Sequence, residues 1–241
     1  MNNVIVFPKS LNLKVLEHSH IISLSALTIC YSAEISKLRQ LGLFDHIEKP
    51  DYLENAAQTR CDEFFAGRIL AQAILEQYFN EIRAITSVQH KLPIWSAGIT
   101  GCISHSKNTV VVVISNQAEY LGIDIENRVN KSFAEDSTAF ILSEFEQQLW
   151  QTGQIQGLSF CEYLTLIFSI KESLYKAVYP IAQQYIDFLE ASVVQINLEH
   201  QSVQLSFCLE VQQKYSLLEC YQGYWKIQGD VILTWVFKSH V

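Results

Sequence analysis

Two acidic side chains, Asp124 and Glu126, lie two residues apart in the segment GIDIE at 122–126. The alternation with isoleucine predicts a strand, and residues two apart in a strand project to the same side. Carboxylates held side by side repel one another unless a cation lies between them. Such oxygen ligands suit Mg²⁺, which commonly binds one or two carboxylates together with substrate phosphates and water. The alternative interpretation is a half-buried edge strand whose polar face is acidic.

A third carboxylate, Glu172, lies among basic side chains in FSIKESLYK at 168–176. In a helix, Phe168, Glu172 and Lys176 follow one another along one face, and Lys171 lies about a quarter-turn to the side. A carboxylate beside two lysines meets the needs of a metal–phosphate site, because the ammonium groups neutralise the remaining phosphate charge. The alternative is a solvated Glu–Lys pair on a helix surface.

Two further groups could bind anions. Ser104 and His105 lie in a predicted loop of small residues just before a strand, where backbone N–H groups can approach a phosphate and the imidazole can donate. Arg60 and Arg68 lie two helical turns apart and therefore on nearly the same helix face, where both could hold a terminal phosphate. A surface histidine and ordinary exposed arginines are the alternatives.

The elements that must position these residues follow an α+β order of helix, strands, helix, strands, in two halves that share a face. Apolar spacing predicts helices over 31–44, 59–79, 137–152 and 159–179. Strands are expected at 109–115 and 120–126, and the chain after residue 190 is β-rich. Gly229-Asp230, between two alternating runs, predicts a tight hairpin.

Composition narrows the classes of function. The 241 residues are 49% hydrophobic and 17% charged, so the chain is expected to fold around a core. A formal net charge of −8 argues against non-specific nucleic-acid binding and requires a local basic patch for any acidic partner. The sequence contains no P-loop and no G-x-G-x-x-G segment, so ATP and dinucleotide enzymes have no support.

The sequence also indicates a compartment. The run VVVVIS at 110–115 is far shorter than the roughly 20 residues of a membrane span. The first residues show no secretion signal. Six cysteines are scattered without a CxxC pair, which favours reduced, mostly buried thiols in a cytoplasmic protein.

Together, these segments resemble the 4'-phosphopantetheinyl transferases of the Sfp type, in particular the subgroup of enterobactin synthetase component D. The resemblance covers about residues 55–190 and departs at Phe168, where many members have Trp, and at Ser96, where a second proline is frequent. Residues 1–50 match no known pattern. The segments that carry the resemblance are GIDIE, FSIKESLYK, CDEFFAGRILA at 61–71, KLPIW at 91–95, ISHS at 103–106, KAVYP at 176–180 and IDF at 186–188.

The resemblance implies a pseudo-two-fold α+β fold with coenzyme A between the halves. Residues 1–118 would form the half that meets the 3'-phosphate, and 119–241 the half with the Mg²⁺ carboxylates and the catalytic helix. Because the pseudo-dimer is built into one chain, a monomer is expected. The implied Mg²⁺ ligands are Asp124, Glu126 and Glu172.

The remaining site residues carry over in the same way. Lys171 and Lys176 would contact phosphates, with Lys176 also stabilising the leaving 3',5'-ADP. Ser104 and His105 would hold the pyrophosphate or the 3'-phosphate. The 3'-phosphate would be recognised by Arg60, Arg68 and Lys91.

The implied reaction moves 4'-phosphopantetheine from coenzyme A to a serine of an apo peptidyl, aryl or acyl carrier protein, for siderophore-type non-ribosomal peptide synthesis. Glu172, directly or through a bound water, would take the serine proton. One alternative is a Mg²⁺-dependent phosphohydrolase of coenzyme A or a nucleotide, which needs no acceptor protein. The other is a carrier-protein binder without activity, which has no need of three clustered carboxylates.

Overall fold

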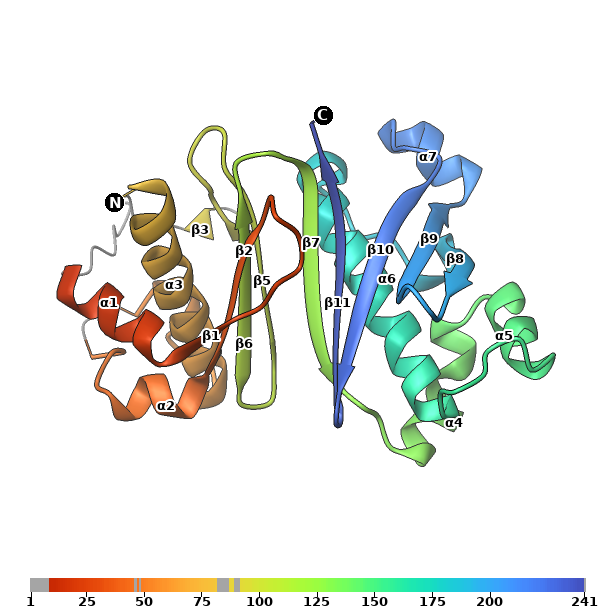
Figure 1. Ribbon diagram of the computed structural model, residues 1–241, viewed down its shortest axis with the longest axis horizontal. Helices are drawn as coiled ribbons and strands as arrows, with labels where there is room; N and C mark the ends of the chain where they lie inside the picture. The colour runs from red at the N-terminus through yellow and green to blue at the C-terminus, as the bar shows by residue number, and fades with distance from the viewer. Residues whose placement is uncertain (1–8, 46, 48, 82–86, 89–91, 241) are drawn as a thin grey trace. The chain divides into compact units, whose positions relative to one another are not determined.

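The computed structural model describes residues 9–45, 47, 49–81, 87–88 and 92–240 (Figure 1). Within these ranges the chain divides into two compact units. Unit 1 contains the residues up to Ala118 together with His240, and unit 2 contains Glu119–Ser239. Each unit has its own antiparallel pairings and its own long helix, so the α+β prediction is confirmed.

Unit 1 is built on a four-stranded sheet with the order β1-β2-β6-β5, in which each neighbouring pair is antiparallel. The helix α3 covers one face of this sheet (Figure 1). Its residues from Phe64 to Leu75 are all buried, which is typical of a helix at the centre of a core. The elements are α1 Lys9–Glu17, β1 Ser19–Ile21, β2 Ile29–Glu34, α2 Ile35–Gln40, the 3₁₀ turn η1 Asp51–Leu53, α3 Gln58–Phe79, the short pair β3 Ser87–Val88 and β4 Leu92–Pro93, β5 Thr100–Ser106 and β6 Thr109–Ser115.

Unit 2 has a five-stranded sheet with the order β7-β11-β10-β9-β8, and the helix α6 packs against β10 and β11 (Figure 1). The helix begins at a capping box, in which Ser159 and Glu162 each bond the other's backbone N–H. The elements are β7 Ala118–Asn127, α4 Lys131–Ile141, α5 Glu144–Gln151, α6 Phe160–Ala182, the 3₁₀ turn η2 Phe188–Glu190, β8 Ala191–Asn197, β9 Ser202–Phe207, α7 Leu209–Tyr215, β10 Tyr221–Gln228 and β11 Val231–Ser239.

Several predicted elements are confirmed. The two long helices agree with the predictions within three residues at either end, and the strands at 109–115 and 120–126 are present. The hairpin is also present: Gln228 pairs with Val231, and Gly229 has a φ of +61°, which favours glycine.

Three predictions were wrong locally. Residues 31–34 belong to β2, because pairing with β6 overrides their helical spacing. The single helix expected over 137–152 is two helices, because Ser143 caps a new helix. The segment 103–106 is not a loop but the end of β5.

Among the helices in the described ranges, none is long and apolar enough to cross a membrane. All six cysteines are free thiols. Cys30, Cys61 and Cys102 are buried, whereas Cys208 and Cys220 are exposed.

Candidate functional site

The acidic segment of β7 lies against α6 in unit 2. Asp124 is only 3% exposed, and Glu126 is half-buried. Gly122 allows this approach, since a Cβ there would lie 1.9 Å from the Ser173 carbonyl oxygen and 2.8 Å from the Ala177 nitrogen. Both obstacles are backbone atoms, so glycine is required where the strand crosses the helix.

The helix α6 brings charged side chains to Asp124. The Lys176 ammonium donates to Asp124 Oδ1 at 2.5 Å. Burial raises the pKa of Glu172, Lys176 lowers it, and the nearby Asp124 carboxylate raises it again. Asp124, Glu172 and Lys176 therefore form one electrostatic group, which we call the carboxylate–lysine cluster.

The chemistry of this cluster suits a divalent cation of the Mg²⁺ type. Two neighbouring carboxylates, Asp124 and Glu172, repel one another in a partly desolvated place, and a cation relieves that repulsion. Within the described residues, no group of three or more His, Cys, Asp or Glu side chains is placed to hold a metal by itself. Mg²⁺ does not require such a cage, because substrate phosphates and water normally complete its coordination.

Lys171 does not lie with this cluster, which corrects the expectation that it contacts a phosphate. Its ammonium is buried and donates three hydrogen bonds, to Glu146 Oε2 at 2.8 Å, to the Ile141 carbonyl at 2.8 Å and to the Phe188 carbonyl at 3.0 Å. Burial lowers the pKa of Lys171, while Glu146 raises it. Since an ammonium has three donors, all of them are used within the protein.

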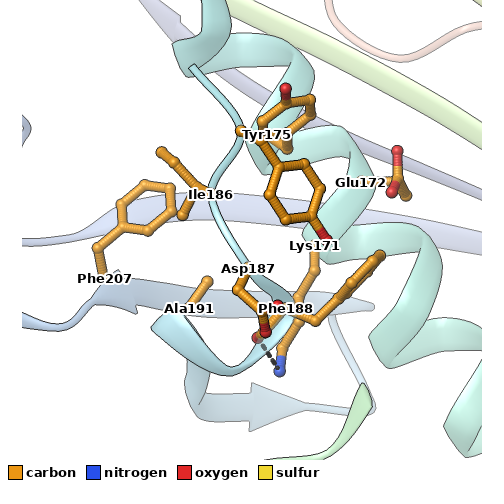
Figure 2. Close-up of a pocket in the computed structure, with 9 residues that line it drawn as sticks. Lys171, Glu172, Tyr175, Ile186, Asp187, Phe188, Ala191 and Phe207 are labelled. Atoms are coloured by element: carbon orange, nitrogen blue, oxygen red, sulfur yellow. Dashed lines mark hydrogen bonds between the residues drawn. The ribbon is translucent and has the colours of Figure 1, made fainter. Parts of the chain in front are cut away.

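A shallow pocket, whose volume of about 340 Å³ includes space open to solvent, lies beside α6, and Figure 2 shows the side chains around it. Glu172 and Lys171 point in different directions from the helix there. Most of the lining is aromatic or aliphatic. The lining residues are Lys171, Glu172, Tyr175, Tyr185, Ile186, Asp187, Phe188, Ala191 and Phe207.

In unit 1, Arg60 and His105 are brought together. Arg60 Nη1 lies 2.9 Å from His105 Nε2 and 3.3 Å from a Glu63 oxygen. Because a guanidinium can only donate, we assign His105 Nε2 as the acceptor, so the imidazole is neutral. The 3.6 Å separation between His105 Nε2 and Glu63 is then not a salt bridge.

Ser104 and His105 are adjacent in β5 and therefore point to opposite faces of the strand. Ser104 is 4% exposed, whereas the His105 side chain is about one third exposed. The structure thus separates two residues that were predicted to act together in a loop.

Arg68 lies on α3, two turns after Arg60, and is 6% exposed. Its guanidinium lies over the Phe64 ring at 4.8 Å from the centroid, and its buried Nε has no hydrogen-bond partner. Burial lowers the pKa of Arg68 to about 10, Tyr52 opposes this shift, and repulsion from Arg60 adds to it. A buried cation with an unpartnered donor is suited to an anionic ligand. Lys91 lies outside the described residues.

Sequence reasoning missed the buried hydroxyl group that bonds Asp124 and the buried carboxyl group that pairs with Lys171. Ser169 donates to Asp124 Oδ2 at 2.7 Å and also contacts Thr234. Nor did sequence reasoning find Glu146, whose carboxylate accepts from Lys171 and from the Val193 backbone. These partners come from elements distant in sequence, so spacing along the chain carried no signal for them.

Two family models match this chain. A model described as the 4'-phosphopantetheinyl transferase N-terminal domain matches residues 48–115, and one described as the 4'-phosphopantetheinyl transferase superfamily matches residues 120–235. Enterobactin synthase component D of Escherichia coli K12 is 30% identical over 76% of this chain and 79% of its own length.

Two further relatives align over less of their length. Enterobactin synthase component D of Salmonella typhi is 35% identical over 64% of this chain and 63% of its own length. The 4'-phosphopantetheinyl transferase Svp of Streptomyces mobaraensis is 24% identical over 61% of this chain and 59% of its own. In both comparisons, the chain spans less than two thirds of the relative.

Proposed function

Because the chain belongs to the 4'-phosphopantetheinyl transferase superfamily, we propose that it transfers the 4'-phosphopantetheine group of coenzyme A to a serine of an apo carrier protein. The products are the holo carrier protein and 3',5'-ADP. The name of the relatives, enterobactin synthase component D, supports a carrier domain of siderophore-type non-ribosomal peptide synthesis as the acceptor.

The single observation that carries this proposal is the carboxylate–lysine cluster. It puts a lysine ammonium, a buried carboxylate and a second carboxylate with a raised pKa within one group. The ammonium can neutralise charge on the oxygen that leaves with 3',5'-ADP. A purely structural ion pair would not need the second carboxylate, Glu172.

We further propose Mg²⁺ as the cofactor, which Asp124, Glu126 and Glu172 would hold together with the substrate diphosphate. When bound, the ion withdraws charge from the diphosphate oxygens and makes the β-phosphorus a better electrophile. The support is the Coulomb repulsion between the buried Asp124 and the partly desolvated Glu172.

The transfer itself balances as a substitution at phosphorus. The serine Oγ forms a bond to the β-phosphorus, which bears the pantetheine arm, and the bond from that phosphorus to the bridging oxygen breaks. The bridging oxygen keeps the electron pair and leaves with 3',5'-ADP near Lys176. The serine proton goes to Glu172, directly or through a water molecule.

Each unit, taken by itself, has groups that suit one part of coenzyme A. In unit 1, the cations Arg60 and Arg68 suit the dianionic 3'-phosphate, and His105 holds Arg60 in place. In unit 2, the mainly apolar pocket beside Glu172 suits the pantetheine arm, which is uncharged and flexible. Lys171 is not included in this set, because its donors are used elsewhere.

The free cysteines support a reducing compartment, and we propose the cytoplasm. All groups invoked come from one chain, which supports action as a monomer.

The decisive experiment is intact-mass analysis of an apo peptidyl carrier domain incubated with the protein, coenzyme A and Mg²⁺. We expect the carrier to gain the mass of one phosphopantetheine group, and EDTA to prevent the gain. Consumption of coenzyme A without modification of peptidyl, aryl or acyl carriers would instead indicate the phosphohydrolase. If coenzyme A is not consumed and no carrier is modified, the remaining candidate is a carrier-protein binder.

A second prediction concerns the base. Glu172→Gln removes the proton acceptor but keeps the shape of the side chain, so we expect transfer to fall at least about a hundredfold. Coenzyme A binding, measured by calorimetry without metal, should change little. A variant with wild-type turnover would contradict the assignment.

A further inference from the structure

Three hydroxyl groups are buried where α6 packs on β11. Ser169, Ser173 and Thr234 are each fully buried, with a relative exposure of 0%. Their neighbours along β11, including Ile232 and Val236, are equally buried and apolar. Buried hydroxyls reduce stability unless they are hydrogen-bonded. Ala in place of Ser and Val in place of Thr would fill this interface without that cost, so packing alone does not explain the three hydroxyls.

The three hydroxyls form a chain that ends on Asp124. Ser169 Oγ lies 2.7 Å from Asp124 Oδ2 and 2.9 Å from Thr234 Oγ1. Ser173 Oγ lies 2.8 Å from Thr234 Oγ1 and 3.0 Å from the Thr234 carbonyl. Thr234 is therefore the link between two serines that are one helical turn apart on α6.

The number of protons determines the direction of this chain. Asp124 accepts on both oxygens, from the Lys176 ammonium at Oδ1 and from Ser169 at Oδ2. Ser169 must give its one proton to Asp124, and it can then only accept from Thr234. Thr234 gives its one proton to Ser169 and can otherwise only accept, while the single proton of Ser173 is shared between Thr234 Oγ1 and the Thr234 carbonyl. Thr234 and Ser169 therefore both donate towards Asp124, and bonds aligned in this way strengthen one another.

We propose that Thr234 is a positioning residue, which holds the Asp124 carboxylate in the rotation that turns Oδ1 towards Lys176 and the cation. The inference rests on the proposed function, because it assigns Asp124 to the diphosphate site. Thr234 acts through Ser169 and does not touch the substrate. Groups that orient a metal-binding carboxylate commonly change metal affinity about 10- to 100-fold when they are removed.

The variant Thr234→Val tests this without disturbing the fold. Valine has nearly the same shape as threonine, Ser169 keeps Asp124 as its acceptor, and Ser173 keeps the carbonyl of residue 234. No buried donor loses its last partner. Thr234→Ser restores the hydroxyl, and Thr138→Val is a matched control, because Thr138 bonds only the Ala134 carbonyl of its own helix.

For Thr234→Val we expect an unchanged melting temperature and about a tenfold higher Mg²⁺ concentration for half-maximal transfer. Thr234→Ser and Thr138→Val should need the same Mg²⁺ concentration as the wild type. An unchanged Mg²⁺ requirement in Thr234→Val would overturn the proposal. So would a Thr234→Ser variant as impaired as Thr234→Val, because a hydroxyl whose return restores nothing is not what the Mg²⁺ requirement depends on.

A crystal structure of Thr234→Val separates this inference from the proposed function. We expect the Asp124 carboxylate to rotate or to adopt more than one rotamer, whether or not the wild type modifies a carrier. An Asp124 side chain that superposes on the wild type would overturn the positioning role. A wild-type protein that modifies no carrier would overturn the proposed function, while the rotation of Asp124 would still report on Thr234.

Discussion

Arg68 shows how a single residue can reduce stability in favour of binding. Its side chain is buried over Phe64, its Nε has no partner, and Arg60 repels it. A guanidinium stays protonated at all relevant pH values, so the lowered pKa of about 10 expresses the unfavourable burial of the charge. Such a side chain is stabilised only when an anion binds beside it.

We predict that Arg68→Met raises the free energy of unfolding by about 1 kcal/mol, because it removes a buried donor without a partner. The same variant should bind coenzyme A more weakly, but should bind dephospho-coenzyme A, which lacks the 3'-phosphate, about as well as the wild type. Urea unfolding and calorimetry measure the two effects.

Arg60→Met is the matched control for Arg68→Met, since its side chain is about half exposed. It should weaken coenzyme A binding without a gain in stability. If Arg68→Met lowers stability, or if both ligands lose affinity equally, then Arg68 is a structural residue and not a phosphate ligand.

At the scale of elements, the buried pair of Lys171 and Glu146 joins five segments of unit 2. Lys171 on α6 bonds the end of α4 and the turn η2 through the carbonyls of Ile141 and Phe188. Glu146 on α5 bonds Lys171 and the backbone of Val193 on β8. The pair therefore holds the wall of the pocket at η2 relative to the helix that carries Glu172.

Replacing one member of this ion pair should strongly reduce the stability of unit 2. We predict that Lys171→Met destabilises unit 2 by about 3–5 kcal/mol, because the Glu146 carboxylate is then buried without its counter-ion. Adding Glu146→Gln should restore part of the loss, since the charge disappears while Oε1 can still accept. Urea unfolding followed by circular dichroism measures both variants.

Lys176→Met provides the contrast, because the Lys176 side chain is 26% exposed and water can solvate Asp124 in part. Lys176→Met should reduce the free energy of unfolding less than Lys171→Met does. It should reduce transfer activity more. Equal stability of the wild type and Lys171→Met would mean that the buried pair does not hold these elements together.

At the scale of the whole molecule, the charge is unevenly divided along the chain. Residues 119–239 hold 15 Asp and Glu against 7 Lys and Arg, whereas the remaining residues hold 10 of each sign. The net charge of −8 thus belongs to the unit with the carboxylate–lysine cluster. An acidic carrier would be repelled by this field, and an anionic substrate would depend on local cations.

Ionic strength should therefore act in opposite directions on the two substrates. We predict that the KM for an acidic carrier domain falls when KCl is raised from about 10 to 150 mM, because screening weakens the repulsion. Over the same range the KM for coenzyme A should rise, because screening weakens its attraction to Arg60, Arg68 and Lys176. A carrier KM that rises with salt would show that a local basic surface governs the encounter instead.

The sequence by itself determined the family, the long helices, the hairpin at Gly229 and the strand that carries Asp124. These depend on local spacing: alternation defines a strand, four-residue steps define a helix face, and Gly-Asp between two strands defines a turn. Asp124, Glu172 and Lys176 could be proposed together because they lie in two short motifs that the family keeps in order.

Only the tertiary structure decided where the remaining side chains of the site point. Lys171 and Glu172 are adjacent in sequence, yet one is buried in an ion pair with α5 while the other lies near Asp124. Ser104 and His105 point to opposite faces because of the pleat of β5. Thr234 is linked to Asp124 through Ser169 only because α6 packs on β11. Such contacts depend on how distant segments pack and on which buried donors find acceptors, and one-dimensional spacing does not contain that information.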